Sequence, residues 1–272
     1  IFSLDKRKCV LYGGTGCPGY YSISFEIPDN ISGPLLISFK SKVNVKKTNP
    51  NTTLIIINTD KNCRIGVSYP DYTFLAYNDY GGHSLYTQPF PIPGEMSSSI
   101  VTIDRPIANG EIMHSYFPTN VFIEKIEKEI GCTSSLSNSI MDNTDEWQNL
   151  SLIVLTGHDE YWTKSLKEKI HNYINKGGNL AIFSGNTAFR ILRIKDKKAT
   201  RIGHWDYIEP IENTIGLAFR YGGLPLNKNQ ALYKLDHLSI DKKVLRNSSG
   251  MKVIESNHDI FKNTNLKNGD YF

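Results

Sequence analysis

One stretch in the second half of the chain constrains the fold more than any other. Two short apolar runs, Leu152–Leu155 and Leu180–Phe183, flank a segment in which apolar residues recur with helical spacing. Thr163 can cap the beginning of that helix, and the Gly177-Gly178 pair can end it. A strand, a helix and a strand of these lengths form a βαβ unit, whose two strands are parallel. We therefore predict an α/β fold, with a mostly parallel sheet and flanking helices.

The N-terminal part of the chain carries the pattern of β-structure. Apolar and polar residues alternate between Tyr21 and Ile27, and Leu35–Phe39 is a second candidate strand. The following residues 41–53 are polar and rich in lysine, which is typical of a linker or a long loop. We predict two parts: a β-rich segment at residues 1–45, the remnant of an upstream β domain, and an α/β domain at residues 46–272.

Two further elements are expected outside the βαβ unit. The uninterrupted apolar run Leu54–Ile57 suits a strand that is buried on both faces. Residues Asn120–Ile130 are predicted to form a helix that ends at Gly131. The apolar residues expected near one face of this helix are Val121, Ile123, Ile126 and Ile130. Beyond Asn186 the pattern weakens, and only 231–235 and 251–255 resemble strands.

Composition excludes several classes of function. The net charge is +4, from 31 Lys and Arg against 27 Asp and Glu, and the positive residues are scattered, so no nucleic-acid partner is indicated. No apolar run approaches the roughly 20 residues of a membrane helix, and no basic-then-apolar leader opens the chain. We expect no membrane partner and a cytoplasmic location. The four cysteines are too few for a disulfide scaffold, and none has the CxxC spacing of a zinc knuckle.

A glycine string near the N-terminus matches the dinucleotide-binding fingerprint in letters only. Gly14, Gly16 and Gly19 have the right spacing, but the mechanism requires a helix directly after the third glycine. Pro18 and an alternating strand pattern stand there instead. We interpret these glycines as a turn between strands.

Polar side chains follow both strands of the predicted βαβ unit. Residues 157–162 follow the first strand and residues 184–187 follow the second. Ligands of an open parallel sheet bind beyond the carboxyl ends of its strands, and a right-handed crossover places both ends at one edge. We therefore expect His158, Glu160 and Asn186 to face one crevice. Either the carboxylate binds a metal, or the imidazole and the carboxylate share acid–base catalysis.

A purely structural role is the alternative for these residues. Asp159 could cap the following helix, His158 could bond a carbonyl, and the Tyr161-Trp162 pair could serve packing alone. A second unusual stretch, Thr73–Tyr86, is dense in Tyr, Asn, Gly and His. It could overhang the same edge of the sheet, or it could be a packed Ω-loop with satisfied phenols.

Several segments together resemble a known family. They are Ala76-Tyr77-Asn78, Gly81-Gly82, Ser84-Leu85-Tyr86, Arg105-Pro106, residues 157–162 and residues 177–187. In order and spacing they are similar to the large subunit of N,N-dimethylformamidase, over roughly residues 19 to 190. The resemblance implies a β-rich region followed by an α/β domain similar to the class I amidotransferase fold, which is flavodoxin-like.

The resemblance also implies a chemistry. The family's large subunit is an iron-dependent amidohydrolase, in which two tyrosinates and one glutamate hold a mononuclear, non-haem ferric ion. By motif position these ligands correspond to Tyr21, Tyr77 and Glu160, with Tyr116 as a substitute for Tyr21. His158 and Asn186 correspond to catalytic polar positions. The expectation is hydrolysis of the C–N bond of a small amide or formamide, with a small subunit and a homo-oligomer as partners.

One departure from the family leaves other functions open. Family members continue past the region of Gly269-Asp270 into a segment with a further acidic residue, so we expect the α/β domain to be truncated at its C-terminus. Glu255 is a poor substitute for that residue. The alternative is a non-catalytic binding or scaffold protein that keeps the fold, with or without the metal. A metal-free enzyme that processes sugars or amides is a third candidate.

Overall fold

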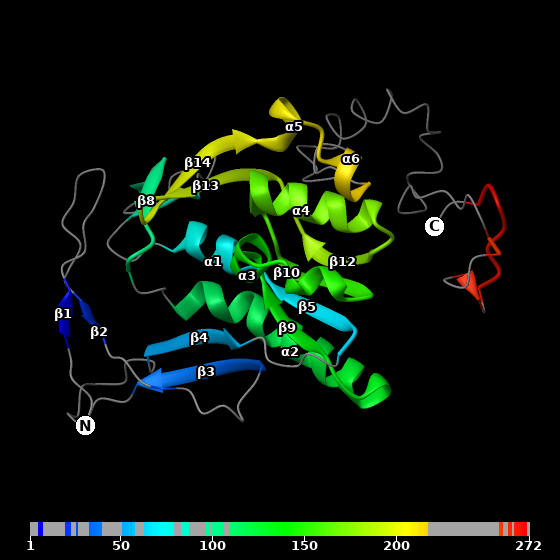
Figure 1. Ribbon diagram of the computed structural model, residues 1–272, viewed down its shortest axis with the longest axis horizontal. Helices are drawn as coiled ribbons and strands as arrows, with labels where there is room; N and C mark the ends of the chain where they lie inside the picture. Colours follow the sequence, from blue (N-terminus) through cyan, green and yellow to red (C-terminus); the bar gives the residue numbers. More distant parts are fainter. Residues whose placement is uncertain are drawn as a thin grey trace. The chain divides into compact units, whose positions relative to one another are not determined.

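The computed structural model describes the chain in several separate ranges (Figure 1). They are residues 5–7, 20–22, 26, 33–39, 51–57, 63–78, 83–86, 96–97, 99–105, 109–216, 256–257, 261–262 and 264–270. The chain divides into two compact units, residues 1–219 and 220–272. The helices and strands below all belong to the first unit, and the described residues of the second form turns and loops.

A four-stranded parallel sheet forms the centre of the first unit. Its strand order is β12 (Asn179–Gly185), β10 (Leu152–His158), β5 (Ile65–Tyr69) and β9 (Ser134–Ser137), and every pair is parallel. Side chains alternate along β10, so Val154 packs against Ile123 of helix α2 (Asn109–Ile130), whereas Ile153 and Leu155 share a core with α4 (Lys164–Asn175). The two helices therefore cover opposite faces of the sheet, as Figure 1 shows.

The predicted βαβ unit is confirmed. Strands β10 and β12 pair in parallel from Leu152↔Asn179 to His158↔Gly185, with α4 between them in sequence. The Leu166 N–H donates to Thr163 Oγ1 at 3.1 Å, the cap that the sequence predicts. Gly177 has a φ of +91°, the left-handed conformation that ends a helix. The α/β class is therefore established, whereas a likeness to the amidotransferase fold stays a prediction.

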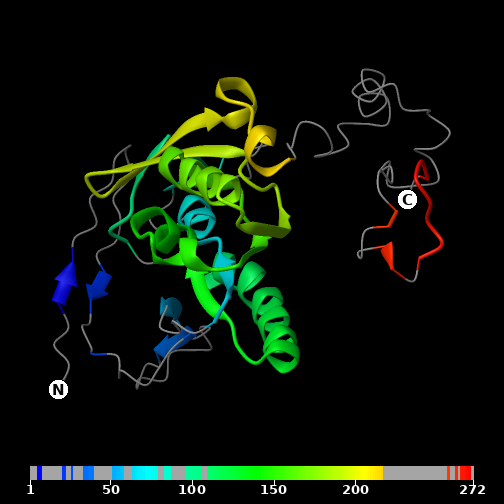
Figure 2. The ribbon, with the colours of Figure 1, turned by 45° about the vertical axis from the view of Figure 1, so that its right-hand side comes forward.

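A second, mixed sheet was not predicted. Its order is β11 (Tyr161–Thr163), β13 (Arg190–Lys195), β14 (Lys198–His204) and β8 (Ile100–Thr102), parallel at the first pair and antiparallel at the others. Asp196 and Lys197 join β13 to β14 with φ values of 50° and 59°, as a two-residue hairpin turn requires. Figure 2 shows this sheet at the end of the α/β body away from α2.

Two predictions near the middle of the chain need correction. The run Leu54–Ile57 lies in strand β4 (Asn51–Ile57), but it pairs antiparallel with β3 (Gly33–Phe39), outside the parallel sheet. The third parallel strand is instead β5, which the sequence does not mark. Residues 51–53 belong to β4, not to the linker, and the predicted domain boundary near residue 45 lies outside the described residues.

Helices differ from their predictions in extent. The Ω-loop interpretation of Thr73–Tyr86 is wrong for residues 73–77, which belong to helix α1 (Asp71–Tyr77). Helix α2 begins at Asn109, not at Asn120. Of the residues expected on its buried face, Ile123 is 6% exposed, but Val121 and Ile130 are 52% and 60% exposed. The face that packs on the sheet also includes the half-buried Phe122.

The remaining elements are short. They are strands β6 (His83–Ser84) and β7 (Met96–Ser97), which pair in parallel, helices α3 (Asn138–Asn143), α5 (Trp205–Ile208) and α6 (Glu212–Ile215), and a 3-10 turn at Glu146–Asn149. Strands β1 (Asp5–Arg7) and β2 (Tyr20–Ser22) pair antiparallel. A strand thus begins directly after Gly19, which agrees with rejecting the dinucleotide motif. The strand-like pieces 231–235 and 251–255 lie outside the described residues.

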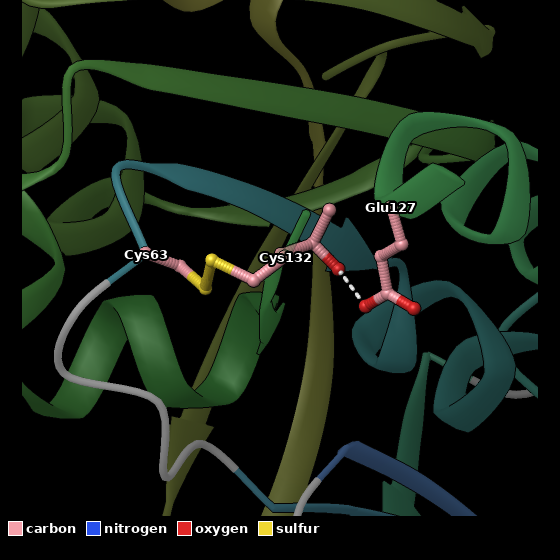
Figure 3. The surroundings of a disulfide bond; sticks show 4 residues. Cys63, Glu127 and Cys132 are labelled. Atoms are coloured by element: carbon pink, nitrogen blue, oxygen red, sulfur yellow. Dashed lines mark hydrogen bonds between the residues drawn. A yellow bond between two sulfur atoms is a disulfide. The ribbon is translucent and has the colours of Figure 1, made fainter. Parts of the chain in front are cut away.

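A disulfide joins two neighbouring parallel strands at their beginnings. Cys63 precedes β5, Cys132 precedes β9, and the bond closes a loop with a sequence separation of 69 (Figure 3). The adjacent Thr133 hydroxyl donates to Glu127 of α2 at 2.8 Å. Disulfides persist mainly in oxidising compartments, so this bond weighs against the cytoplasmic location that we predicted. None of the helices in the described ranges is long and apolar enough to cross a membrane.

Candidate active site

Strands β10 and β12 end side by side, and their last side chains meet. His158 is the last residue of β10 and is in register with Gly185, the last residue of β12. Asn186 follows in the left-handed conformation, with φ of 53°. Its Nδ2 lies 3.0 Å from His158 Nε2. The prediction that both polar clusters share one edge of the sheet is therefore confirmed.

The carboxylate of Glu160 is the centre of this polar cluster. It is 3% exposed, yet each of its oxygens has partners. Oε2 accepts a hydrogen bond from the Tyr77 hydroxyl at 2.6 Å and lies 3.4 Å from His158 Nε2, whereas Oε1 accepts from Arg190 Nε at 3.2 Å. Burial alone would raise the pKa of Glu160, but the hydrogen bonds from His158, Tyr77 and Arg190 outweigh it and lower the pKa.

The backbone around Glu160 is fixed from two sides. Thr73 Oγ1 of helix α1 accepts hydrogen bonds from the Glu160 N–H at 2.9 Å and from the Tyr161 N–H at 3.2 Å. On the other side, the Arg190 N–H donates to the Glu160 carbonyl at 2.8 Å, as part of the β11–β13 pairing. Helix α1 and strand β13 thus hold the carboxylate in place between them.

Tyr77 is surrounded by aromatic rings. It is the last residue of α1, and its ring stacks on Tyr86 with centroids 4.3 Å apart. The rings of His158 and Tyr161 meet it edge-on at 5.3 Å and 6.1 Å. Burial and then the charge of Glu160 raise the pKa of Tyr77, so the phenol stays protonated and donates to the carboxylate. A phenolate here therefore requires a strongly positive partner.

His158 Nε2 lies between two groups of different hydrogen-bonding character. When Nε2 carries no proton, the Asn186 amide can donate to it across 3.0 Å. When it is protonated, Glu160 Oε2 at 3.4 Å accepts, and the Asn186 amide must present its oxygen. The side chain is 36% exposed, so water or a small substrate can reach this nitrogen. Nε2 can therefore both take up and release a proton at the edge of the sheet.

Asp159 does not cap the following helix, and the burial of the aromatic pair agrees with a role in packing. Thr163, not Asp159, caps α4. Asp159 is 1% exposed and accepts a hydrogen bond from Asn138 Nδ2 at 3.0 Å, and burial raises its pKa to about 7. Tyr161 and Trp162 are fully buried in the core, and Tyr161 also meets the Tyr77 ring of the site.

Sequence reasoning missed Arg190, which the structure brings to Glu160. Arg190 begins β13 and faces His204 of β14, with Nη1 2.5 Å from His204 Nε2. A lone arginine within a run of apolar residues carries no catalytic motif, so no local signal could have found it. Burial, and to a smaller extent the charge of Arg190, lowers the pKa of His204.

Other predicted ligands are not tested by the structure. Tyr21 lies in β2, in register with Lys6, and Tyr116 lies in α2, but the side chains of both are outside the described part of the chain. Glu255 is also outside it. Of the predicted site residues, Tyr77, His158, Glu160 and Asn186 are brought together.

The donor set at Glu160 fits a hard cation. Tyr77 Oη and Glu160 Oε2 are 2.6 Å apart, close enough for one ion to replace the proton between them. Phenolate and carboxylate oxygens are donors that a hard, highly charged cation such as Fe³⁺ prefers. Within the described ranges, no three His, Cys, Asp or Glu side chains form a metal cluster. A metal here would therefore depend on tyrosine oxygen.

Comparison with protein families bears on the whole of this region. A family model described as N,N-dimethylformamidase beta subunit-like, C-terminal, matches residues 17–272. This range includes the parallel sheet, the mixed sheet and the cluster around Glu160. A search of curated proteins finds no match.

Proposed function

The chain belongs to the N,N-dimethylformamidase beta subunit-like family, and from this premise we propose that it hydrolyses the C–N bond of a small amide or formamide at the cluster around Glu160. One observation carries the proposal: a buried carboxylate oxygen, Glu160 Oε2, lies 2.6 Å from a phenol and 3.4 Å from an imidazole at the edge of a parallel sheet. Such an edge is where α/β folds bind their ligands.

We propose that the site works with a mononuclear, non-haem ferric ion, held by Glu160 and Tyr77, with Tyr21 as the expected third ligand. When bound, the ion would polarise the amide carbonyl and acidify a water molecule. It would also supply the positive charge that the phenolate of Tyr77 requires, since burial and Glu160 both favour the protonated phenol. Arg190 keeps Oε1 occupied, so that Oε2 is the oxygen that faces the site.

His158 is the proposed proton carrier. Its Nε2 takes a proton from the attacking water, whose oxygen bonds to the carbonyl carbon. The same nitrogen then gives the proton to the leaving amine nitrogen as the C–N bond breaks, so the products are a carboxylic acid and an amine. Asn186 steadies the ring at 3.0 Å and offers an amide for a hydrogen bond to the substrate. The aromatic rings of Tyr77 and Tyr86 exclude water from one side.

A partner subunit is part of the proposal. The family is described by the beta subunit of an enzyme, so we propose that this chain assembles with a small subunit and with further copies of itself. Co-expression and size-exclusion chromatography with light scattering would measure the assembly.

The test begins with metal content and a panel of amides. Protein purified without chelator or nickel is expected to hold close to one iron per chain by elemental analysis, and to release amine from a small formamide. Glu160→Gln should lower iron content at least tenfold. His158→Ala should retain the iron and lower kcat by about a hundredfold or more, as loss of a general base does. Glu168→Gln is the matched control, because Glu168 is an exposed carboxylate on α4.

Each result has a contrary outcome. Iron content that is unchanged in Glu160→Gln would remove Glu160 from the ligand set. Loss of iron in His158→Ala would make His158 a ligand and not the proton carrier. One equivalent of a metal other than iron would contradict the ferric site, and amine release by His158→Ala at the native rate would contradict the mechanism.

One observation favours a second candidate, a non-catalytic binding protein of the same fold. Both oxygens of Glu160 have protein partners, Tyr77 and Arg190. A carboxylate satisfied in this way can be purely structural. Iron-free protein that releases no amine from any formamide of the panel would favour this candidate.

A further inference from the structure

A groove in the first unit has a lining that is separate from the Glu160 cluster. It has a volume of about 770 Å³, within the range of small-molecule sites, and lies between helices α1, α3 and α5, the beginning of α4, and strands β13 and β14. Neither Glu160, Tyr77, His158 nor Asn186 lines it. We propose that this groove binds a small molecule with an aliphatic chain and a primary ammonium head.

The apolar part of the groove accounts for the chain of the ligand. Its lining includes Leu75, Ile191, Ile202, Trp205 and Ile208. Ile202 and Ile208 are 43% and 61% exposed, so apolar surface faces solvent at the groove. A ligand chain that covers these side chains removes that surface from water, which is favourable at about 25 cal/mol per Å².

Asp142 accounts for the head of the ligand. Its Oδ2 accepts hydrogen bonds from the Tyr72 hydroxyl and from the Thr163 hydroxyl, both at 2.7 Å. Burial raises the pKa of Tyr72, so that phenol remains a donor, and the Thr163 oxygen also accepts from the Leu166 N–H. Both hydroxyl protons are therefore committed to Oδ2. Among the described residues, Oδ1 of Asp142 has no hydrogen-bond partner.

Three further charged residues of the groove already have partners, and a fourth, the exposed Arg193, has no ion pair among the described residues. Glu209 pairs with Lys167, and Lys164 pairs with Glu168 at 3.7 Å. Asp71 accepts from the N–H of Ser139 at 3.0 Å and from its hydroxyl. Within the described part of the chain, no ion pair includes Asp142. A primary ammonium supplies both the charge and the donors that this carboxylate lacks.

The probe is n-hexylammonium, measured by isothermal titration calorimetry on the full chain. Saturable binding is expected with a dissociation constant on the order of 1 mM, as suits a ligand of this size. Hexan-1-ol and hexanoate have the same chain with a neutral and an anionic head, and both should bind at least tenfold more weakly.

Two variants and a control locate the binding. Asp142→Asn should weaken n-hexylammonium binding about tenfold or more and leave hexan-1-ol unchanged. Ile208→Lys places a positive charge at an exposed position of the groove and should abolish n-hexylammonium binding with an unchanged melting temperature. Asp145→Asn is the control, because Asp145 is a nearby carboxylate that is 73% exposed and does not line the groove.

Contrary outcomes are equally defined. No saturable heat up to about ten times the expected constant, or hexan-1-ol binding as tightly as n-hexylammonium, would overturn the proposal. So would native affinity in Asp142→Asn or in Ile208→Lys. If Asp142→Asn does not fold, Ile208→Lys decides alone. None of these measurements depends on iron or on amide hydrolysis.

Discussion

Helix α1 sends a tyrosine to each of two carboxylates, and the two carboxylates differ in the rest of their partners. Tyr77 donates to Glu160 at 2.6 Å at the edge of the parallel sheet, and Tyr72 donates to Asp142 at 2.7 Å at the groove. Glu160 also has a guanidinium and an imidazole nearby, whereas the one further hydrogen bond of Asp142 among the described residues comes from the hydroxyl of Thr163. The same tyrosine–carboxylate pair is thus built into two different electrostatic settings.

The different partners of Glu160 and Asp142 show what keeps a buried carboxylate charged. Neutral donors offset only part of the cost of burial, whereas a cation offsets more of it. Glu160 has the cation from Arg190, and its pKa is lowered in spite of burial. This supply of charge suits Glu160 to acid–base or metal chemistry. Asp142 has no cationic partner among the described residues, and this suits it to binding a cationic ligand.

Removing Arg190 should have the largest effect on stability. Arg190→Met leaves Glu160 buried without its cation, and loss of one partner of a buried ion pair costs about 3–5 kcal/mol of the free energy of unfolding. Urea denaturation at pH 7 measures this change. Arg193→Met is the matched control, because Arg193 lies on the same strand but is exposed, and should cost less than about 0.5 kcal/mol. Equal stability of the two variants would show that Glu160 does not depend on Arg190.

A third carboxylate, Asp159, should make the free energy of unfolding depend on pH. It adjoins Glu160 in sequence, but it is fully buried with neutral partners such as Asn138, and its pKa is raised to about 7. A raised folded-state pKa gives stability that is present below the ordinary value of about 3.9 and is lost as pH rises through about 7. We expect the free energy of unfolding to fall by roughly 3 kcal/mol from pH 5 to pH 8, at 1.36 kcal/mol per pKa unit.

Asp159→Asn is the variant that assigns this pH dependence. The amide cannot ionise, so the fall between pH 5 and pH 8 should disappear. Glu160 has the opposite sign: its lowered pKa gives stability that is present above the ordinary glutamate value and is lost only as pH falls below it. If the free energy of unfolding of the native protein does not change from pH 5 to pH 8, Asp159 is ionised and paired.

Removing each tyrosine hydroxyl separates the two regions by function. Tyr77→Phe and Tyr72→Phe each delete one hydrogen bond to a carboxylate, a loss of about 2 kcal/mol. Stability alone should therefore not distinguish them. Iron content should, because only Tyr77 lies at the proposed metal site, and Tyr86→Phe keeps the stacked ring as a control. Equal iron in Tyr77→Phe and Tyr72→Phe would contradict the assignment of Tyr77 as a ligand.

Sequence patterns predicted those helices and strands whose own residues show a clear periodicity, cap or end. Strand β10, helix α4 and strand β12 have apolar periodicity, a threonine cap and a glycine end. Strand β5 has only five residues and includes Gly66 and Ser68, so its burial comes from its position between β10 and β9. Conversely, the apolar run of β4 predicted a strand correctly but not its partner, since pairing is a tertiary choice.

The candidate site was predictable to the same extent. His158, Glu160 and Asn186 followed from topology, because parallel strands bring their carboxyl ends to one edge. Tyr77 came from a family resemblance and not from periodicity. Arg190 could not be found, because it reaches Glu160 from β13, a strand of the mixed sheet that the sequence does not mark. Sequence patterns therefore could not show that Glu160, unlike Asp142, lies beside the positive charge of an arginine.

The smallest effect concerns Thr163, which joins Asp142 to helix α4. Its hydroxyl oxygen accepts from the Leu166 N–H at 3.1 Å, and its proton goes to Asp142 Oδ2. Thr163→Ala removes both bonds, and loss of a helix cap costs about 1 kcal/mol. Thr163→Ser keeps the hydroxyl and should restore nearly all of that stability by urea denaturation. Neither variant should change iron content, because Thr163 belongs to the region of Asp142. If Thr163→Ala instead lowers iron together with stability, the two regions are coupled through α1 and cannot be treated as independent sites.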